Sequence, residues 1–408
     1  FYKAEIYWKG EKNDYYLVYY IFSGSLFIFS VITLFLNKII KDYLIIFTIS
    51  VVTGLYLFEG YLTYWIDRPK IYKQQTGLKY DTRTKIEVYK DLKKINDKVV
   101  MRVTPMNYIN NNNSLYPLSG ISNSETIQCN ESGFFAINKS DRFGFNNPDT
   151  EWNQKEIEFL LVGDSFAHGA CVNRPDDVAS VLRTLSDKSV LNLGYAANGP
   201  LTEYATLREY LNPNVKKVIW MYYEFNDLLD LKNELKNKTL KNYLYDLNFS
   251  QNLKEKQNEI NELANNIIFR ELKKETEKKR IKSSFSFNLF NFVKLYELRT
   301  SFFREQPKPQ KEFIKILKQA NDLITKNNSK LYFVYLPGYF KYKMNYGDAS
   351  YLEVKKIVTD LKIPFIDIHS EVFEKEKDPI KLFPFGLFGH YTSEGYKKVA
   401  IAIYKLSK

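Results

Sequence analysis

The stretch Val162-Gly163-Asp164-Ser165-Phe166 decides how this chain folds. It follows an apolar run, residues 157–161, and an apolar run that ends abruptly in Gly-Asp-Ser is typical of a buried strand that gives way to a helix. At the carboxyl edge of an α/β sheet, such a turn presents the serine hydroxyl where sites form. The same tripeptide also suits an ordinary turn with a helix N-cap, so it needs support from elsewhere in the chain.

Three later segments supply the other parts that acyl transfer requires. Residues 191–200 read as a short strand that opens into a loop of small residues, which offers backbone N–H groups. An apolar strand that starts at Val215 ends in Asn226 and Asp227, which adds a side-chain amide. His390, just before the last predicted helix, adds an imidazole base. A nucleophile, a base and donors for an oxyanion are the roles that acyl transfer needs.

With these four blocks in order over roughly residues 157–408, the chain resembles the SGNH/GDSL family of esterases and acyltransferases. The motif positions of that family fall on Gly163, Asp164, Ser165, Ala197, Asn226, Asp227 and His390. The resemblance implies that Ser165 is the nucleophile and His390 the general base. It also implies an oxyanion hole made by the backbone N–H groups of Ser165 and Ala197 and the side-chain amide of Asn226.

Two positions depart from the family pattern. Ala197 stands where the family usually has glycine, and alanine adopts a positive φ at a higher cost. Leu387 and Phe388 occupy the positions where the family places an aspartate before His390. Three explanations stay open: a Ser–His dyad whose imidazole is held by a backbone carbonyl, a carboxylate from elsewhere, or reduced activity. The dyad is the preferred prediction, and Asp378 is the nearest upstream aspartate.

The other two histidines have weaker claims to the role of base. His168 lies on the helix that follows Ser165 and is expected to point away from its hydroxyl. Asp367 and His369 share one face at the end of a predicted strand, so they form a rival dyad.

The two cysteines, Cys129 and Cys171, permit two interpretations. Either both are free buried thiols, or they form a disulfide that pins the segment around Cys129 beside the nucleophile loop and indicates an oxidising compartment. Two cysteines are too few for a structural zinc site, so neither a metal nor a cofactor is predicted.

Composition narrows the possible partners. The chain has 408 residues, a net charge of +12 and 45% hydrophobic residues, which permits one large folded domain with accessory parts. The positive charge is compatible with nucleic acid, but no recognition module of interleaved basic and aromatic residues is visible, so nucleic acid is not predicted. Anionic lipid headgroups or an acidic glycan fit the sequence better.

Two apolar runs near the N-terminus predict a transmembrane helical hairpin at residues 15–66, after a short segment 1–14. The runs span residues 15–36 and 43–66, and each meets the roughly 20-residue length of a spanning helix. Glu59 is the only acidic residue in the second run. The alternative, two core helices of a soluble domain, is unusual for adjacent runs of this length.

The hairpin predicts an address in the bacterial inner membrane, but the side of the catalytic part is ambiguous. The positive-inside rule, counted strictly on the flanking lysines and arginines, favours the cytoplasm. The possible disulfide and the envelope glycans that similar membrane-tethered esterases modify favour an extracytoplasmic, periplasmic side, which is the preferred prediction.

The alternation of strands and helices from residue 157 onward predicts the fold class. Strands are expected at 157–164, 189–195, 215–223, 330–336 and 363–368, with helices between them. This rhythm predicts a three-layer α/β domain with a parallel sheet, residues 157–408, of the flavodoxin-like type that the family has. Residues 67–156 are expected to be a linker and accessory segment.

A lysine-rich insertion at about 228–312 interrupts the predicted domain. It ends in an aromatic run, residues 285–303. The insertion is either a solvated charged surface or a lid over the site, and its aromatic residues either stack on sugar rings or belong to a core.

Together these features predict a membrane-anchored serine esterase or O-acyltransferase that acts on O-acyl, chiefly acetyl, esters of cell-envelope glycans through a Ser–His acyl-enzyme. The expected partners are an acylated glycan or another ester substrate, the lipid bilayer and envelope polysaccharide biosynthesis proteins. The alternative is a weakly active or inactive protein of the same fold that binds or assembles glycans, which the missing aspartate motivates. A lipid-directed esterase is a third possibility, suggested by the membrane anchor.

Overall fold

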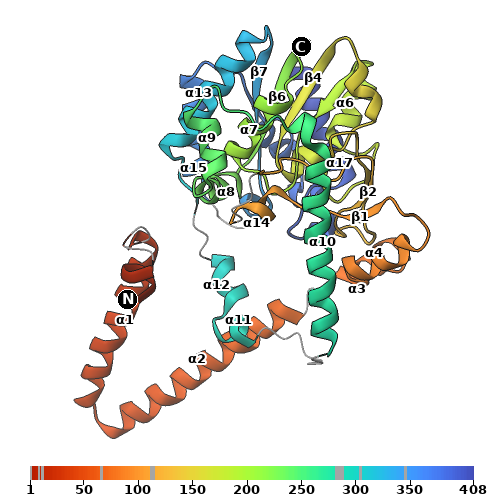
Figure 1. Ribbon diagram of the computed structural model, residues 1–408. Helices are drawn as coiled ribbons and strands as arrows, with labels where there is room; N and C mark the ends of the chain where they lie inside the picture. The colour runs from red at the N-terminus through yellow and green to blue at the C-terminus, as the bar shows by residue number, and fades with distance from the viewer. Residues whose placement is uncertain are drawn as a thin grey trace. The chain divides into compact units, whose positions relative to one another are not determined.

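The computed structural model describes residues 2–7, 10, 13–64, 68–110, 115–280, 289–302, 306–343 and 347–408. Parts of the predicted segments 1–14, 43–66, 67–156, 228–312 and 285–303 lie outside these residues. The chain divides into two compact units (Figure 1). Unit 1 comprises Phe1–Asp67 and Ser284–Glu305, and unit 2 comprises Arg68–Ser283 and Gln306–Lys408. The expected accessory segment therefore folds with the α/β domain from Arg68 onward, whereas the aromatic part of the insertion groups with the N-terminal apolar runs.

A parallel sheet of five strands forms the centre of unit 2, which confirms the predicted α/β fold. In sequence order the strands are β4 (Ile157–Gly163), β5 (Val190–Asn192), β6 (Val215–Tyr223), β7 (Lys330–Leu336) and β8 (Phe365–Asp367). Their spatial order is β5-β4-β6-β7-β8, and all neighbours pair in parallel. This is the doubly wound order in which the chain reverses direction between β4 and β6, so a crevice is expected at their carboxyl ends.

Both faces of the sheet are buried, which makes three layers. Alternate side chains of β6 enter two separate apolar clusters, with Trp220 in one and Met221 in the other. Helices α7 (Pro200–Tyr210), α9 (Lys238–Tyr245), α10 (Gln257–Arg280), α13 (Lys311–Lys326) and α15 (Ala349–Asp360) contribute to the first cluster. Helices α6 (Val178–Ser186) and α17 (Ser393–Leu406) contribute to the second. Strands buried on both faces explain the uninterrupted apolar runs in the sequence.

Shorter elements complete unit 2. The other helices are α3 (Arg68–Thr76), α4 (Lys85–Lys93), α5 (Ser165–His168), α8 (Asp227–Glu234), α14 (Tyr339–Lys343) and α16 (Ile368–Glu371). Single 3₁₀ turns occupy Pro105–Tyr108, Asp149–Asn153, Leu253–Lys256, Phe373–Lys375, Pro379–Leu382 and Pro384–Gly386. A small second sheet contains β1 (Val99–Met101), β2 (Glu125–Ile127) and β3 (Ile137–Lys139), with β1 parallel and β3 antiparallel to β2. The loop between β2 and β3 carries Cys129.

Unit 1 begins with a short π-helix (Tyr2–Tyr7) and contains α1 (Asn13–Leu34), α2 (Lys38–Tyr64), α11 (Leu289–Val293) and α12 (Tyr296–Phe302). Helix α2 begins earlier than the apolar run because the side chain of Asn37 accepts the Ile40 N–H at 2.9 Å, as an N-cap does. Among the described residues, Lys38–Thr63 is long and apolar enough to cross a membrane, with a mean hydropathy of 1.7. The apolar stretch of α1, Tyr19–Leu34, is shorter, so a hairpin of two spanning helices is not confirmed.

Candidate active site

The nucleophile stands on a tight turn between β4 and α5. Gly163 is required there, because a Cβ at this position would lie 2.6 Å from the carbonyl oxygen of Met221 on β6. Asp164 is fully buried, and its carboxylate caps α5 by accepting the Phe166 N–H at 2.8 Å. Ser165 is the first residue of α5 and is partly exposed. Its own N–H therefore has no partner within the helix and remains available to a ligand.

A hydroxyl, an imidazole and a carboxylate meet at this turn. The Nε2 atom of His390 lies 2.9 Å from the Oγ atom of Ser165. The Nδ1 atom of His390 lies 3.0 Å from Oε1 of Glu131, and Oε2 of Glu131 accepts the His390 backbone N–H at 2.6 Å. In this order, Nδ1–H donates to the carboxylate and Nε2 is left to accept the serine proton, which is the arrangement of a serine hydrolase triad.

Glu131 supplies the carboxylate that the sequence just before His390 lacks. The imidazole contacts a carboxylate from elsewhere in the chain, not the backbone carbonyl expected for a dyad. Asp378, the nearest upstream aspartate, lies in a surface turn, where its Oδ2 atom is 3.9 Å from the Nζ atom of Lys381. Sequence reasoning missed Glu131 because it lies in the loop between β2 and β3, far ahead of the four motif blocks. Its one sequence signal is its position two residues after Cys129.

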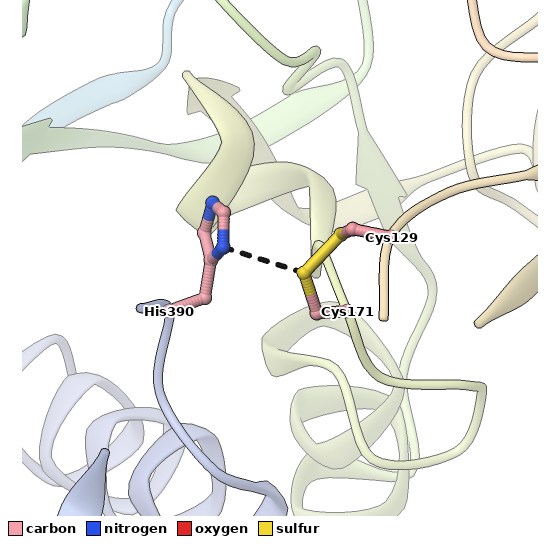
Figure 2. A group of neighbouring side chains, drawn as sticks. All are labelled: Cys129, Cys171 and His390. Atoms are coloured by element: carbon pink, nitrogen blue, oxygen red, sulfur yellow. Dashed lines mark hydrogen bonds between the residues drawn. A yellow bond between two sulfur atoms is a disulfide. The ribbon is translucent and has the colours of Figure 1, made fainter. Parts of the chain in front are cut away.

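A disulfide joins the loop that carries Glu131 to the loop that follows the nucleophile. Cys129 and Cys171 are bonded, with their Cα atoms 5.0 Å apart. Figure 2 shows the His390 ring beside this bond, where the Sγ atom of Cys171 lies 3.4 Å from Nδ1. These three side chains are close enough together to hold a metal ion, but sulfur atoms in a disulfide are not thiolates and do not serve as metal ligands.

The electrostatics favour an ionised Glu131. Burial opposes its ionisation, but the electrostatic attraction of His390 and the hydrogen bonds from that residue outweigh burial, so the pKa of Glu131 is lowered. The guanidinium of Arg68 acts in the same direction. Arg68 also donates a hydrogen bond to the backbone carbonyl of Phe388, which holds the chain just before His390. A carboxylate that stays charged at neutral pH can stabilise the imidazolium that forms during acyl transfer.

Three phenylalanines pack against one another in an aromatic wall that includes the residue two positions before His390: Phe225, Phe340 and Phe388. Phe388 occupies a position where the family has its aspartate, and its ring centroid lies 5.0 Å from that of Phe340 and 5.9 Å from that of Phe225. The Phe388 side chain remains 45% exposed. Phe388, two residues before His390, is therefore part of a partly exposed apolar surface.

The loop predicted to donate backbone N–H groups adopts the conformation that glycine favours. Ala197 has a φ of 62°, in the left-handed region that costs alanine more than glycine. Glu234 fixes this loop by accepting the N–H groups of Gly199 at 2.7 Å and Leu201 at 3.0 Å. A buried carboxylate thus holds a strained backbone in place.

Asn226 lies at the carboxyl end of β6, where the chain enters α8. Its side-chain amide donates to the carboxylate of Asp230 at 2.9 Å and also stabilises that of Asp164 by hydrogen bonding. Because the amide faces these two carboxylates, its role as an oxyanion donor stays a prediction. Asp227, the next residue, is buried and accepts the Tyr223 N–H at 2.9 Å, so it shapes the turn.

Several buried carboxyl groups below the site have raised pKa values. Burial and the neighbouring Glu234 raise the pKa of Asp230 to about 8, and burial raises the pKa of Glu234 to about 6. Burial, together with like charges, also raises the pKa values of Asp227 and Glu203 well above the ordinary range. A carboxyl group with a raised pKa keeps its proton to a higher pH in the folded state than in the unfolded chain, so its contribution to stability is largest at low pH and falls as the pH rises.

The other histidines have separate partners. His168 is buried, with Nδ1 3.2 Å from the Gly194 carbonyl oxygen, and burial lowers its pKa to about 3. His369 contacts the Tyr342 hydroxyl at 2.8 Å, whereas Asp367 pairs with Lys355 at 3.0 Å. The rival dyad of Asp367 and His369 is therefore not formed.

Comparison with known proteins adds little to this geometry. No protein-family model matches the chain, and no curated protein matches its sequence. Among solved structures, a protein of Desulfitobacterium hafniense DCB-2 whose name places it in the G-D-S-L family of lipolytic proteins is 12% identical, with a TM-score of 0.35 over 62% of this chain and 99% of that protein. The Bacillus subtilis protein YXIM is 10% identical, with a TM-score of 0.35 over 62% of this chain and 56% of that protein. At such similarity the chemistry has to be inferred from the side chains of the site.

Proposed function

We propose that this protein is a membrane-tethered serine esterase or O-acyltransferase that acts on O-acyl, chiefly acetyl, esters of cell-envelope glycans. The observation that carries the proposal is the unbroken relay from Ser165 Oγ to His390 Nε2 at 2.9 Å and from His390 Nδ1 to Glu131 Oε1 at 3.0 Å. Hydroxyl, imidazole and carboxylate in this order are the groups that activate a serine for attack on an ester.

In the first half of the reaction, His390 removes the proton of Ser165 as its Oγ attacks the ester carbonyl carbon. The negative charge that develops on the carbonyl oxygen is stabilised by the backbone N–H groups of Ser165 and Ala197 and by the Asn226 amide. The bond to the alcohol then breaks, and the alcohol leaves with the proton from His390. The acyl group remains on Ser165, and Glu131 stabilises the transient imidazolium.

In the second half, His390 removes a proton from water or from a sugar hydroxyl, which attacks the acyl-enzyme. Water as the acceptor releases a carboxylic acid, and a sugar hydroxyl as the acceptor produces a new ester. Both outcomes return the proton to Ser165, so the enzyme is regenerated without a metal or a cofactor in the scheme.

The aromatic wall supports a glycan substrate. The partly exposed ring of Phe388, with Phe225 and Phe340 beside it, offers an apolar surface next to His390 on which the C–H face of a sugar ring can pack. The net charge of +12 favours an acidic polymer over a neutral one. A glycan made at the membrane would bring this protein near polysaccharide biosynthesis proteins.

Two features support the proposed address. Helix α2 has the length and composition of a membrane span over Lys38–Thr63. The bond between Cys129 and Cys171 lies against His390, and disulfides of this kind persist in oxidising compartments. Both features agree with a catalytic unit held on the extracytoplasmic side of the inner membrane.

A fluorophosphonate probe tests the proposed chemistry in the full chain reconstituted in nanodiscs. We expect covalent labelling at Ser165, together with hydrolysis of a soluble aryl acetate, and neither in a Ser165→Ala variant. A His369→Ala variant is the matched control and should label like the unmodified protein, because His369 contacts Tyr342 and Glu374. Well-folded protein that resists labelling would favour the non-catalytic glycan-binding alternative. The absence of an aspartate just before His390 motivates that alternative, and Glu131 supplies a carboxylate in its place.

A further inference from the structure

The aromatic part of the insertion packs against α2 within unit 1. Figure 1 shows α11 and α12 beside α2, and both are in contact with it. The hydroxyl of Tyr56 donates to the Val293 carbonyl oxygen at 2.9 Å, and the rings of Tyr56 and Phe292 lie 5.5 Å apart. Gly60 also lies at this approach, where a Cβ would be in ordinary van der Waals contact with the Phe292 ring at 3.9 Å. Segments far apart in sequence thus make a specific joint.

Glu59 is the centre of this joint. Its side chain is only 1% exposed, and its two oxygens accept the N–H groups of Glu297 at 2.9 Å and Leu298 at 2.8 Å. These N–H groups belong to the first turn of α12, where no intrahelical acceptor exists. A carboxylate of one helix therefore caps another helix, which gives a physical reason for the single acidic residue in the apolar run.

The joint lies near one end of the span. From Lys38 to Glu59 an α-helix rises about 30 Å, which is about the thickness of the hydrocarbon core. A helix pair held by Glu59 therefore meets α2 at the depth of the headgroups, at the end away from the α1–α2 turn. Charged side chains inside hydrocarbon are costly, but at this depth their cost is small.

The composition of residues 289–302 suits that depth. The segment contains aromatic residues together with Lys294 and Arg299. Aromatic and basic residues are enriched where a membrane meets water. Val293 is 56% exposed and Tyr296 is 38% exposed, so apolar surface remains outside the joint with α2.

We propose that residues 289–302 form an interfacial membrane element, docked on α2 through Glu59, that lies in the headgroup layer of the bilayer. The insertion then returns the chain to the membrane between two segments of unit 2, so the protein holds lipid at two places in its sequence. This inference rests on the proposed membrane attachment.

Depth-resolved fluorescence quenching tests this element in the full chain. Because both native cysteines form the disulfide, an introduced cysteine is the sole free thiol and can carry an environment-sensitive dye. The sites are Val293→Cys on α11, Ile49→Cys in the middle of α2 and Ile95→Cys on unit 2, all of them exposed. The vesicles contain nitroxide lipids labelled either near the headgroup or near the bilayer centre.

We expect the dye at position 293 to be quenched more by the shallow label, the dye at 49 more by the deep label, and the dye at 95 by neither. Quenching at 49 without quenching at 293 overturns the interfacial element and leaves the membrane attachment standing. Absence of quenching at 49 overturns the attachment itself. The two failures are therefore distinguishable.

A second variant isolates the role of Glu59. In the Val293→Cys background, Glu59→Leu removes both acceptors while keeping α2 apolar, and we expect shallow quenching at 293 to fall toward the value at 95. Glu59→Gln is the matched control, because its amide oxygen still accepts a hydrogen bond and should retain most of the quenching. Undiminished quenching in Glu59→Leu would overturn the docking through Glu59.

Discussion

The turn that carries Ser165 and the loop that carries Glu131 differ in how their positions are set. The turn is defined by its own neighbours: Gly163 fits against Met221, and Asp164 caps the short helix that Ser165 begins. The loop has a local turn in which the Asn130 side chain accepts the Gly133 N–H at 3.0 Å, but Glu131 is also held by the disulfide and by contacts with His390. One end of the relay is therefore built from local sequence, and the other end depends on a distant covalent link.

The strongest test of this comparison removes the charge at the distant end. Glu131→Gln keeps the shape of the side chain but leaves the imidazolium without a carboxylate, so we expect kcat for a soluble aryl acetate to fall by about 10⁴-fold. Asp378→Asn is the matched control and should retain full activity, because Asp378 lies in a surface turn beside Lys381. A Glu131→Gln variant with nearly normal turnover would return the Ser–His dyad as the better mechanism.

Removing the amide at the end of β6 should have the next largest effect. If Asn226 donates to the oxyanion, Asn226→Ala lowers kcat by about 10²–10³-fold with little change in KM. Its amide also contacts Asp230, so thermal stability is measured alongside activity. Normal kcat with lowered stability would assign Asn226 to the carboxylate network alone.

Removal of the disulfide between Cys129 and Cys171 should make the position of Glu131 less fixed while its carboxylate remains in the chain. In a Cys129→Ser/Cys171→Ser variant we expect kcat to fall by about 10²-fold, because a catalytic group misplaced by about 1 Å costs that much. The free energy of unfolding should also fall by about 2–5 kcal/mol. A reductant should reproduce the loss in the unmodified protein and have no effect on the variant. Full activity of the variant would show that Glu131 is positioned without the disulfide.

The buried carboxyl groups predict a pH dependence of stability. An aspartate in the unfolded chain titrates near 4, whereas burial raises the pKa of Asp230 to about 8 in the folded protein. Between these values the folded state binds more protons, so the stabilisation is complete at low pH and is lost as the pH rises through 8. His168, whose pKa burial lowers to about 3, has the opposite effect only below about pH 6.5.

The test window for Asp230 is therefore pH 6.5 to 8. There, the free energy of unfolding should fall with pH, and Asp230→Asn should remove up to about 1.4 kcal/mol per pH unit of that slope. Chemical denaturation followed by near-ultraviolet circular dichroism at several pH values measures this slope. An unchanged slope in the variant would mean that Asp230 is not the group that titrates.

The smallest expected effect concerns the backbone of the donor loop. Ala197 has a φ of 62°, so Ala197→Gly should raise the free energy of unfolding by about 1 kcal/mol and leave kcat unchanged. Thermal unfolding and steady-state kinetics check both quantities. A destabilised variant would show that the Cβ of Ala197 makes packing contacts that outweigh the backbone strain.

Several features could be predicted from the sequence because interactions between nearby residues determine them. The apolar runs became buried strands in a parallel sheet, since a strand covered on both faces must be apolar throughout. Ser165 and His390, chosen from motifs, lie 2.9 Å apart. The N-terminal runs are helices, and within the part of the chain that the structure describes, α2 alone has the length and composition of a span.

Other features were not readable, because they depend on which surfaces meet. The sequence around Phe388 does not indicate that Glu131 supplies the carboxylate to His390. It also does not indicate that Asp367 and His369 have separate partners. The sequence permits three interpretations of the insertion and its aromatic run: a lid over the site, a surface that stacks on sugar rings, or part of a core. The described part of the run packs on α2. No periodicity or spacing encodes such contacts.

The sequence by itself determined the α/β sheet, the nucleophile turn and the apolar character of α2, because strand burial, a glycine turn and helix hydropathy act over a few residues. Only the tertiary structure decided which carboxylate contacts the catalytic imidazole and which one caps α12. Glu131 and Glu59 each accept backbone N–H groups from segments hundreds of residues away in the chain, at His390 and at Glu297. Such partners are selected by packing, since a buried carboxylate is stable only where donors converge on it and here those donors come from distant segments.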